Sequence, residues 1–440
     1  MMSKLRLNPP QILALGFLSL IILGSLLLST PWAVAQGETD WLTAFFTSTS
    51  AVCVTGLVVV DTGTHWSLFG QVVILMLIQV GGLGVMSFAT FFALLLRKRI
   101  LLKQRLIMQQ ALNKSSVEGI VSIFRYLLLF SFIAEIIGAL ILAARWYPSM
   151  GWLKALWFGF FHSVSAFNNA GFDIFGNFSS LTGYTTDIVT NMVISTLFLV
   201  SGLGFVVIYE IYQFRESKKL SLHSRLVLIT TLVLVCLGTT IILISEYNNA
   251  LRGLSPVGKL VTAYFQAVAP RTAGFNTIDI SATLLSSQML LMFLMFIGGS
   301  PGSTAGGIKT TTFTLLGLAV YSNLRGKRDT EVFRRRISHQ EVNRALAITI
   351  LALALVFLVT FTLTFTEKGD LVQILFEVVS AISTVGLTLG LTTELSDPGR
   401  ILIIITMFLG RLGPLTIGYA LAYRQKQPDI RYPEGRIMVG

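Results

Sequence analysis

Four short stretches of this chain share a pattern that suits coordination of a cation by backbone oxygens. Each contains an aromatic residue, continues through small and β-branched residues, and ends in a glycine followed by Leu or Phe. The stretches are 44–57 (AFFTSTSAVCVTGL), 159–172 (GFFHSVSAFNNAGF), 263–275 (AYFQAVAPRTAGF) and 374–387 (ILFEVVSAISTVGL). Because glycine lacks a Cβ, its backbone reaches conformations that other residues resist. Rings of backbone carbonyls can replace the hydration shell of a potassium ion.

The last four residues of each stretch are the candidate ion-binding residues. They are Cys53, Val54, Thr55 and Gly56; Asn168, Asn169, Ala170 and Gly171; Arg271, Thr272, Ala273 and Gly274; and Ser383, Thr384, Val385 and Gly386. Their side chains differ widely between the copies, from a thiol to a guanidinium. Such differences would disrupt a site made of side chains, but not one made of backbone, so we predict a potassium site of backbone carbonyls.

The spacing of the four glycines predicts a fourfold internal repeat. Neighbouring glycines lie 115, 103 and 112 positions apart, and a phenylalanine precedes each by ten residues, or by nine in the third copy. This period exceeds the 20–50 residues of solenoid repeats. We expect four similar units around one axis, at 1–115, 116–222, 223–340 and 341–440.

The composition predicts an integral membrane protein. Hydrophobic residues make up 53% of the chain and charged residues 12%, with a mean hydropathy of +0.75. We expect an all-α membrane protein in which each unit is helix, pore loop, helix, giving eight spanning helices around a central pore. Outward helices are expected near 11–30, 120–144, 226–245 and 345–365, and return helices near 67–96, 186–212, from 287 onward and at 401–423. An alternative for 13–28 is the core of a signal peptide.

Between the helices of each unit lies an apolar segment of about 12 residues, such as 41–52 or 371–382. At about 1.5 Å per residue it cannot cross a hydrocarbon core of about 30 Å. We expect it to enter the membrane and return on the same side, which requires protein or water around its backbone. The alternative is an ordinary extracellular amphipathic helix.

The distribution of positive charge indicates orientation rather than nucleic-acid binding. The formal net charge is +12, and 24 of the 33 Lys and Arg residues fall at the N-terminus and in 97–125, 215–225, 325–344 and 424–436. Cytoplasmic loops carry such an excess, so both termini are expected in the cytoplasm. Cys53 and Cys236 fall in different units and imply no disulfide framework.

The third return helix is interrupted by the glycine-rich stretch 297–312 (IGGSPGSTAGGIKTTT), where the other units have only GGLG (81–84), GLG (202–204) and GRLG (410–413). Proline and clustered glycines disfavour helix. Loose backbone on the cytoplasmic side of the glycines is well placed to obstruct a pore, and we predict a gate. Its residues are Gly298, Gly299, Ser300, Pro301, Gly302, Ser303, Thr304, Ala305, Gly306 and Gly307, together with Lys309 and Arg411.

Charged residues near the predicted pore have two interpretations each. Lys309 and Arg411, inside return helices, could oppose a resting cation and favour its exit, or they could pair with Glu210 or with loop carbonyls. Arg271 could point sideways, salt-bridged behind the filter, or into the axis, where it would repel a cation.

Asp61, Asp173 and Asp279 follow three of the glycines, and could raise the local cation concentration at an outer mouth. Alternatively, they are solvated loop residues without a role.

Two enzyme motifs match only formally. Gly298–Gly302 fits GxSxG, but that elbow requires a strand-to-helix turn with a histidine and an acid nearby. Residues 302–310 resemble a phosphate-binding loop, but Ile308 separates the glycine from Lys309.

The four glycine-ended loops and the GGSPGSTAGG interruption together resemble the Trk/Ktr/HKT superfamily of potassium transporters, and the chain is more similar to its KtrB branch than to TrkH. The resemblance extends from about 11 to 440. It implies a potassium-translocating subunit, not an enzyme, in the bacterial plasma membrane. It assigns ion coordination to the carbonyls of Val54, Thr55, Asn169, Ala170, Thr272, Ala273, Thr384 and Val385, the gate to 298–308, and an arginine below the filter to Arg411.

The resemblance also implies partners. Similar proteins are homodimers with the C-terminal tail, here 433–440, at the interface. They bind a cytoplasmic ring of KtrA-like regulatory subunits that hold adenine nucleotides, and sodium often stimulates their uptake. A glycine at the end of the first filter, here Gly56, is the potassium-favouring form. No cofactor is expected apart from K⁺ as substrate and Na⁺ as an activator.

Three functions remain open from the sequence. The first is channel-like potassium uptake under control of the gate. The second is a sodium-coupled cation symporter, whose usual sign is broken helices in matching halves of the chain. The third and most remote is an intramembrane serine protease acting through Ser300.

Overall fold

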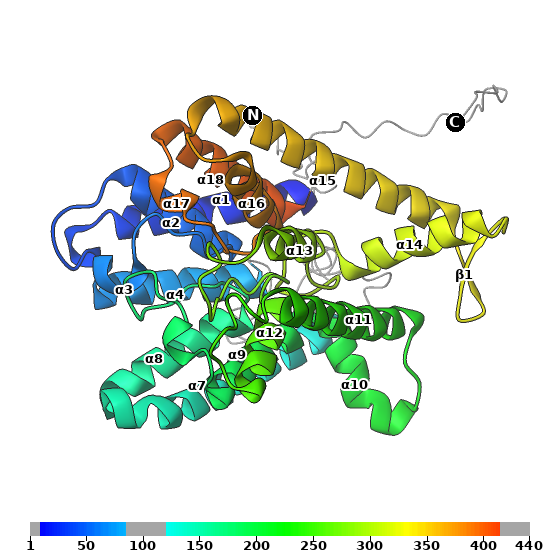
Figure 1. Cartoon of the computed structure of the whole chain (residues 1–440), viewed down its shortest axis with the longest axis horizontal. Helices are drawn as coiled ribbons and strands as arrows, with labels where there is room; N and C mark the ends of the chain where they lie inside the picture. Colours follow the sequence, from blue (N-terminus) through cyan, green and yellow to red (C-terminus); the bar gives the residue numbers. More distant parts are fainter. Residues whose placement is uncertain (1–8, 85–119, 414–440) are drawn as a thin grey trace, which may run out of the picture.

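Helices dominate the computed structural model, which describes residues 9–84 and 120–413 (Figure 1). The helices of the first two repeats are α1 (Pro9–Leu28), α2 (Trp41–Cys53), α3 (Thr62–His65), α4 (Leu68–Leu83), α7 (Ile120–Met150), α8 (Trp152–Phe167), α9 (Ile188–Gly202) and α10 (Phe205–Ser217). Those of the last two are α11 (Leu222–Ser245), α12 (Pro256–Val268), α13 (Leu285–Phe296), α14 (Thr310–Leu324), α15 (His339–Thr366), α16 (Leu371–Ser383), α17 (Leu391–Glu394) and α18 (Asp397–Leu412).

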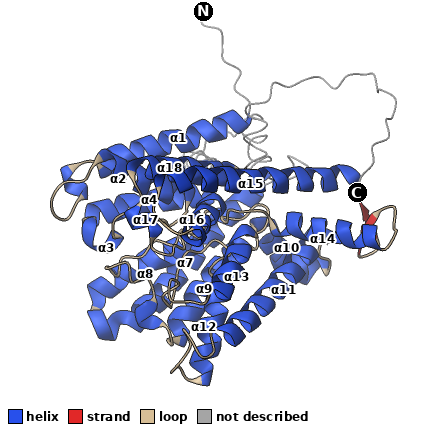
Figure 2. Cartoon of the chain, turned by 45° about the horizontal axis from the view of Figure 1, so that its top comes forward, coloured by secondary structure: helices blue, strands red, loops and turns tan. Residues whose placement is uncertain are grey.

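Strands are confined, in the part of the chain that the structure describes, to one small hairpin between repeats three and four (Figure 2). In it β1 (Thr330–Val332) pairs antiparallel with β2 (Arg335–Ile337). The all-α prediction is therefore confirmed.

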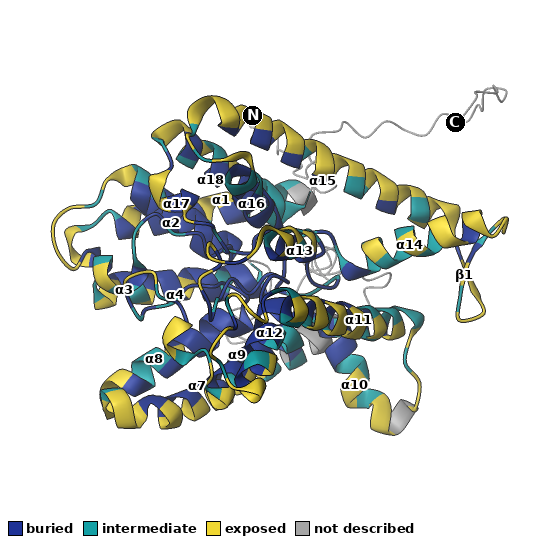
Figure 3. Cartoon of the chain, in the orientation of Figure 1, coloured by how far each residue is buried: buried dark blue, intermediate teal, exposed yellow. Residues whose placement is uncertain are grey.

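The outward helices α1, α7, α11 and α15 each have a stretch long and apolar enough to cross a membrane. Their outer faces expose large apolar side chains, such as Leu232 at 65% and Phe357 at 73% (Figure 3). A water-soluble surface does not carry apolar faces of this extent, so these are lipid-facing surfaces. Helix α1 is part of this packing, because the Ser48 hydroxyl of α2 donates to the carbonyl of Ile21, 2.7 Å away.

The short helices α2, α8, α12 and α16 are buried at their C-terminal ends, where every residue of 46–53, 161–167, 265–268 and 376–383 is buried. At 13–16 residues they are about 20–24 Å long. Their phenylalanines Phe46, Phe161, Phe265 and Phe376 are completely buried. The alternative of surface amphipathic helices is therefore wrong, and we call these four the pore helices.

The return helix of repeat two is broken at Gly202–Gly204, where α9 and α10 are bent by 96°, which is sharper than a kink at its glycines. Gly204 of this break has φ of +91°, and Gly84 and Gly413, which follow α4 and α18, have φ of +86° and +81° with nearly equal ψ. Only glycine adopts this conformation without strain.

Several expectations fall on residues outside those described. They are the end of the first return helix at 85–96, most of the basic segment 97–125, the end of the fourth return helix at 414–423, the basic segment at 424–436 and the tail at 433–440.

Candidate functional site: four pore loops and the loop beneath them

The pore helices of repeats one, two and four end in the same turn. One residue after each of these helices has a left-handed backbone conformation. These residues are Val54, Asn169 and Thr384, with φ of +57°, +59° and +49°. The amide of this residue donates to the carbonyl three residues back, and the next amide donates to the carbonyl five residues back, at 2.8–2.9 Å. This is the Schellman motif of helix C-termini.

In repeat three, where the stretch from phenylalanine to glycine is one residue shorter, the turn is one residue tighter. Thr272 is left-handed at φ +84°, but the amide of Ala273 donates to the carbonyl of Ala269, four residues back rather than five, at 2.9 Å. The left-handed residue therefore stands two positions before the glycine in all four loops.

Hydrogen bonds from the pore helices hold the glycine-containing loops. The amides of Gly56 and Gly386 donate to the hydroxyls of Ser50 and Ser380 at 3.1 and 3.0 Å. In repeat two the corresponding hydroxyl, of Ser165, donates instead to the carbonyl of Phe172 at 2.7 Å. In these three repeats a serine of the pore helix therefore fixes the loop that follows it.

The four glycines form a closed ring. A Cβ added to Gly56 would lie 3.2 Å from the Cα of Gly171, one on Gly171 would lie 2.9 Å from the Cα of Gly274, and one on Gly386 would lie 2.9 Å from the Cα of Gly56. One on Gly274 would meet the carbonyl oxygen of Val385. The ring therefore runs from repeat one through two, three and four and back to one.

Carbonyl oxygens lie between the neighbouring glycines of this ring. The oxygen of the residue before each glycine lies against the glycine of a neighbouring repeat: Ala170 against Gly56, Ala273 against Gly171, Val385 against Gly274 and Thr55 against Gly386. Each repeat thus contributes one backbone oxygen to the contacts between the four loops.

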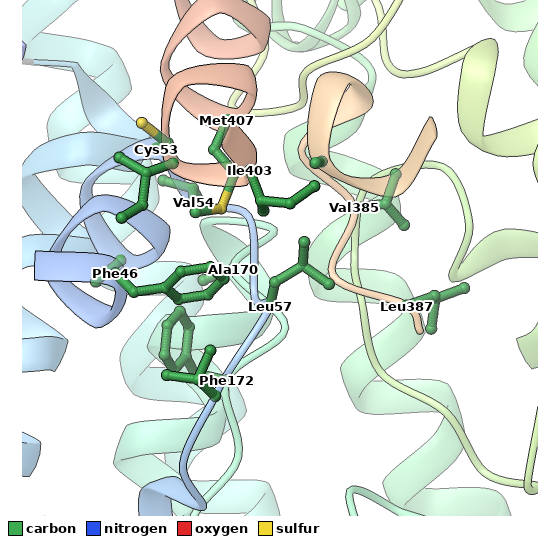
Figure 4. Close-up of a cluster of buried hydrophobic side chains, with 14 of the residues drawn as sticks. Phe46, Cys53, Val54, Leu57, Ala170, Phe172, Val385, Leu387, Ile403 and Met407 are labelled. Carbon is green, nitrogen blue, oxygen red and sulfur yellow. The ribbon is translucent and has the colours of Figure 1, made fainter. Parts of the chain in front are cut away.

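An apolar shell supports the loops from behind (Figure 4). Met407 and Ile403 of α18 meet Cys53 and Val54 of the first loop, and Phe46 lies beside Phe172. These side chains are less than 2% exposed. The shell keeps water away from the back of the loops, which strengthens electrostatic interactions at their front.

The glycine-rich stretch of repeat three is a compact loop whose two ends lie side by side. Ile297 and Ile308 form a parallel bridge, and the amide of Ile308 donates to the carbonyl of Phe296 at 3.1 Å. The loop docks on the bend between α9 and α10, since the amide of Ser300 donates to Gly202 and the amide of Phe205 donates to Gly302, at 3.0 and 2.9 Å.

The loop lies against the second and fourth pore loops. The Asn169 side-chain amide donates to the Thr304 hydroxyl at 2.6 Å. A Cβ on Gly306 would lie 2.6 Å from the carbonyl oxygen of Ser383 and would meet the Thr384 hydroxyl. Only glycine fits at 306 beneath the fourth pore loop.

Arg411 and Lys309 contact carbonyl oxygens. Arg411 of α18 donates to Thr304 and Gly81 at 2.5 Å, tying the loop of repeat three to repeats one and four. Lys309 donates to Ala305 at 2.7 Å. Glu210 instead accepts from Ser221 and Ser224, so of the pairings expected the loop carbonyls are the ones observed.

Arg271 points sideways, away from the ring. Its guanidinium lies 3.4 Å from the Thr231 hydroxyl of α11, and the residue is 6% exposed. Within residues 9–84 and 120–413 no carboxylate lies at ion-pair distance, so the expected salt bridge is absent there, and two of the guanidinium nitrogens have no hydrogen-bond partner.

The three mouth carboxylates hold local turns. Asp61 accepts from the amide of Thr64 at 2.8 Å and from that of Phe178 in repeat two at 2.6 Å. Asp173 accepts from the amide of Phe175, and Asp279 from that of Ser281. They lie beyond the glycines along the chain, so both interpretations of their role remain open.

Ser300, the nucleophile of the protease alternative, is fully buried. Its hydroxyl lies 3.0 Å from that of Thr310. The described histidines that make hydrogen bonds or ion pairs contact other residues: His65 contacts Thr39, His162 contacts Phe158 and His339 contacts Asp329.

Residues 11–430 match the family model of TrkH, a cation transport protein. The chain belongs to this family. The match covers nearly all of the sequence and confirms the resemblance inferred from the pore loops. The TrkH family consists of transport proteins, not enzymes.

Named relatives of the TrkH family align over nearly the whole chain. The chain is 45% identical to the Ktr system potassium uptake protein B of Bacillus subtilis, with 99% of this chain and 97% of that protein covered. It is 39% identical to the potassium/sodium uptake protein NtpJ of Enterococcus hirae, with 99% and 98% covered.

A solved TrkH structure has the same fold. The potassium transporter TrkH from Vibrio parahaemolyticus superimposes with a TM-score of 0.76 at 21% identity, covering 96% of this chain and 87% of that one. At this identity the likeness concerns the fold alone.

Two buried carboxylates of this TrkH-family chain were not among the predicted site residues. Glu377 of α16 accepts from the hydroxyls of Thr388 and Thr392 at 2.7 and 2.5 Å, bracing the turn after Gly386. Glu135 of α7 accepts from two amides behind the second pore loop. A lone carboxylate in an otherwise apolar helix is the sequence signal that could have identified them.

Proposed function

We propose that this protein takes up potassium through the ring formed by Gly56, Gly171, Gly274 and Gly386. The observation that carries the proposal is the closed ring of four glycines, in which each repeat places one carbonyl oxygen beside the glycine of a neighbouring repeat. Carbonyl dipoles in such an arrangement replace the water shell of a cation that enters. The names of the aligned relatives, which describe potassium or potassium/sodium uptake, support this choice of ion.

Sequence differences among the loops fit this mechanism. The residues that offer oxygens to the centre are Thr55, Ala170, Ala273 and Val385, and their side chains have little in common. The backbone conformation is what they share. The membrane potential drives the ion inward, with about 2.3 kcal/mol per charge for each 100 mV. The carboxylates at the mouth raise the local concentration of cations.

The loop at 298–307 is the gate in this proposal. It lies against the second and fourth pore loops and is held by Arg411 and Asn169. Opening requires these contacts to break, and the broken helix formed by α9 and α10 gives the loop a surface along which to move. Lys309 and Arg411 donate hydrogen bonds to carbonyls of the gate loop. In this proposal they therefore affect transport by holding the gate in place.

Regulation and assembly follow the same proposal. The chain works as a homodimer in the bacterial plasma membrane with both termini in the cytoplasm, and a KtrA-like nucleotide-binding ring controls the gate. The basic cytoplasmic segments 215–225 and 325–344 provide the docking surface. Sodium acts as an activator.

A sodium-coupled symporter is the second candidate, favoured by the name of the potassium/sodium uptake relative. The glycine-rich interruption at 297–312 occurs in repeat three alone rather than in matching places of two halves, which counts against a symporter. The bend between α9 and α10 is a second broken helix and weakens that argument. The single ring built from four repeats favours the channel-like candidate, because symporters bind their substrates between two related halves of the protein.

Uptake of radioactive rubidium into proteoliposomes of the purified protein tests the proposal. With an imposed inside-negative potential and no sodium, we expect saturable uptake that potassium blocks at far lower concentration than sodium. Uptake that requires a sodium gradient would instead establish the symporter. No uptake under either condition would refute cation transport by this chain. Labelling of Ser300 by a fluorophosphonate is the result that would support the protease.

A further inference from the structure

A cavity of about 430 Å³ lies between the small β hairpin and the turn that joins α10 to α11. The hairpin is at the same edge of the molecule as this turn (Figure 1). None of the residues around the cavity belongs to the pore loops or to the gate loop at 298–307. The cavity is lined by Glu210, Gln213, residues 219–222, Arg225, Phe333 and Arg335.

The lining of this cavity carries more positive than negative charge. Lys219, Arg225 and Arg335 contribute three cations, against the single carboxylate of Glu210. That carboxylate is already engaged, because it accepts hydrogen bonds from the N-cap and the first turn of α11 at 3.0 and 2.7 Å. The start of α11, where the helix dipole is positive, also lines the cavity. The cavity therefore suits an anion.

The two arginines of the cavity have no acidic partner. In the part of the chain that the structure describes, no carboxylate lies at ion-pair distance from Arg225 or Arg335. The next residue of the hairpin, Arg336, does have one, since it lies 3.5 Å from Asp329. Successive side chains of a strand point to opposite faces, so Arg335 lines the cavity while Arg336 turns to Asp329.

The cavity lies at the end of a membrane span. Helix α11 has 24 residues and is apolar enough to cross a bilayer. At about 36 Å it exceeds a hydrocarbon core of about 30 Å, so its ends reach the headgroup layers. Arg225, Ile229 and Leu232 are four and three residues apart and lie on one face of this helix. Ile229 and Leu232 are 49% and 65% exposed, which continues the cavity as an apolar stripe.

We propose that this cavity binds the phosphate headgroup of an anionic phospholipid, with Arg225 and Arg335 as the phosphate-binding residues. Guanidinium groups match phosphate oxygens with two parallel hydrogen bonds, and basic pockets between membrane spans bind the headgroups of anionic lipids. The acyl chains of the lipid extend along Ile229 and Leu232. This site goes beyond the proposed transport mechanism and needs no ion in the ring.

An acidic segment of the proposed regulator is the competing occupant, because the cavity belongs to the basic segments 215–225 and 325–344. The apolar stripe on α11 favours the lipid. A peptide side chain has no acyl chain to cover Ile229 and Leu232, whereas a phospholipid fits the charged cavity and the stripe at once.

The unfolding temperature of the purified full-length protein in detergent tests the proposal. Dioleoylphosphatidylglycerol and dioleoylphosphatidylcholine share their acyl chains and a phosphodiester, but only the first has a net negative charge. We expect the first to raise the unfolding temperature in a saturable manner, as a ligand of the folded state does, and the second to have little effect. Glycerol phosphate at the same concentration separates a soluble phosphate from a lipid.

Substitutions locate the effect in the cavity. Each cation near an anionic headgroup is worth roughly a fivefold change in affinity, so the double variant Arg225→Gln/Arg335→Gln should raise the half-saturating lipid concentration by roughly tenfold or more. Arg225→Lys/Arg335→Lys keeps both charges and should lose less affinity. The matched control Arg328→Gln/Arg344→Gln removes two exposed cations that do not line the cavity, and should respond as the wild type does.

Several results would overturn the lipid site. They are equal stabilisation by both lipids, and a wild-type response of Arg225→Gln/Arg335→Gln to phosphatidylglycerol. Equal stabilisation by glycerol phosphate would assign the cavity to a soluble phosphate, and no response to any of the three ligands would leave it to an acidic partner. None of these results bears on potassium uptake, which the rubidium assay tests separately.

Discussion

Replacing Gly274 by serine should weaken the preference for potassium over sodium. Gly274 has φ of +74°, where a residue with a Cβ is disfavoured by about 1–2 kcal/mol. The new Cβ would also meet the carbonyl oxygen of Val385 and would lie 2.9 Å from the Cα of Gly171. Ordinary contacts begin near 3.4 Å, so the third loop must move away from the second and the fourth by about half an ångström or more.

The size of the effect follows from the oxygen that moves. Loss of one well-placed polar contact in a desolvated site is worth about 1–3 kcal/mol. If most of that loss falls on the binding free energy of potassium, the ratio of potassium affinity to sodium affinity should fall by roughly tenfold or more. Rubidium uptake with sodium as competitor measures this as a lower sodium concentration for half inhibition.

The matched control is Gly317→Ser. This glycine lies in α14, and a Cβ there would have nothing within 4 Å. We expect wild-type selectivity from it. A folded Gly274→Ser protein with an unchanged ratio of potassium to sodium would refute the assignment of the ring as the selectivity filter.

Three further changes test the gate and the support of the ring. Deleting 301–306 should raise flux in the absence of a regulator, because the bridged ends of the loop allow shortening; flat or lower flux would mean that the loop is not a gate. Arg411→Gln removes charged hydrogen bonds from Arg411 to the gate and to α4, which are worth about 1.5–3 kcal/mol. Basal rubidium flux should therefore rise about tenfold. A fall in flux would contradict a restraining role for Arg411. Ser380→Ala leaves the buried amide of Gly386 without its acceptor, so it should reduce the free energy of unfolding by about 1–3 kcal/mol, measured by denaturation in detergent. The control Ser19→Ala, on the outer face of α1, should leave the free energy of unfolding unchanged.

The sequence predicted the repeat, the short helices and the place where they converge, because those depend on strong local signals. The expected segments 41–52 and 371–382 differ from α2 and α16 by one residue at one end. Apolar runs of fixed length and glycines at fixed spacing identify such elements without any knowledge of their neighbours.

Features that depend on tertiary packing were not predicted. The left-handed residues Val54 and Thr384 are β-branched, which is the least expected residue type at positive φ, and only the surrounding structure holds them there. The glycines at 202–204 predict a kink, but not the 96° bend between α9 and α10, because the size of a bend depends on what the two halves of the helix pack against. The network of Glu135 joins α4 to α7, and no local pattern links residues so far apart in the chain.

The closed ring also has a consequence for how such a pore can be tuned. In a symmetric assembly of four identical subunits, any substitution alters all four quadrants at once. Here each quadrant belongs to a different part of one polypeptide, so Arg271 can occupy one corner while Asn168, Cys53 and Ser383 occupy the others. In the proposed pore a single codon change therefore adjusts a quarter of the ion's surroundings, which would permit graded changes of preference that a fourfold-identical pore cannot make.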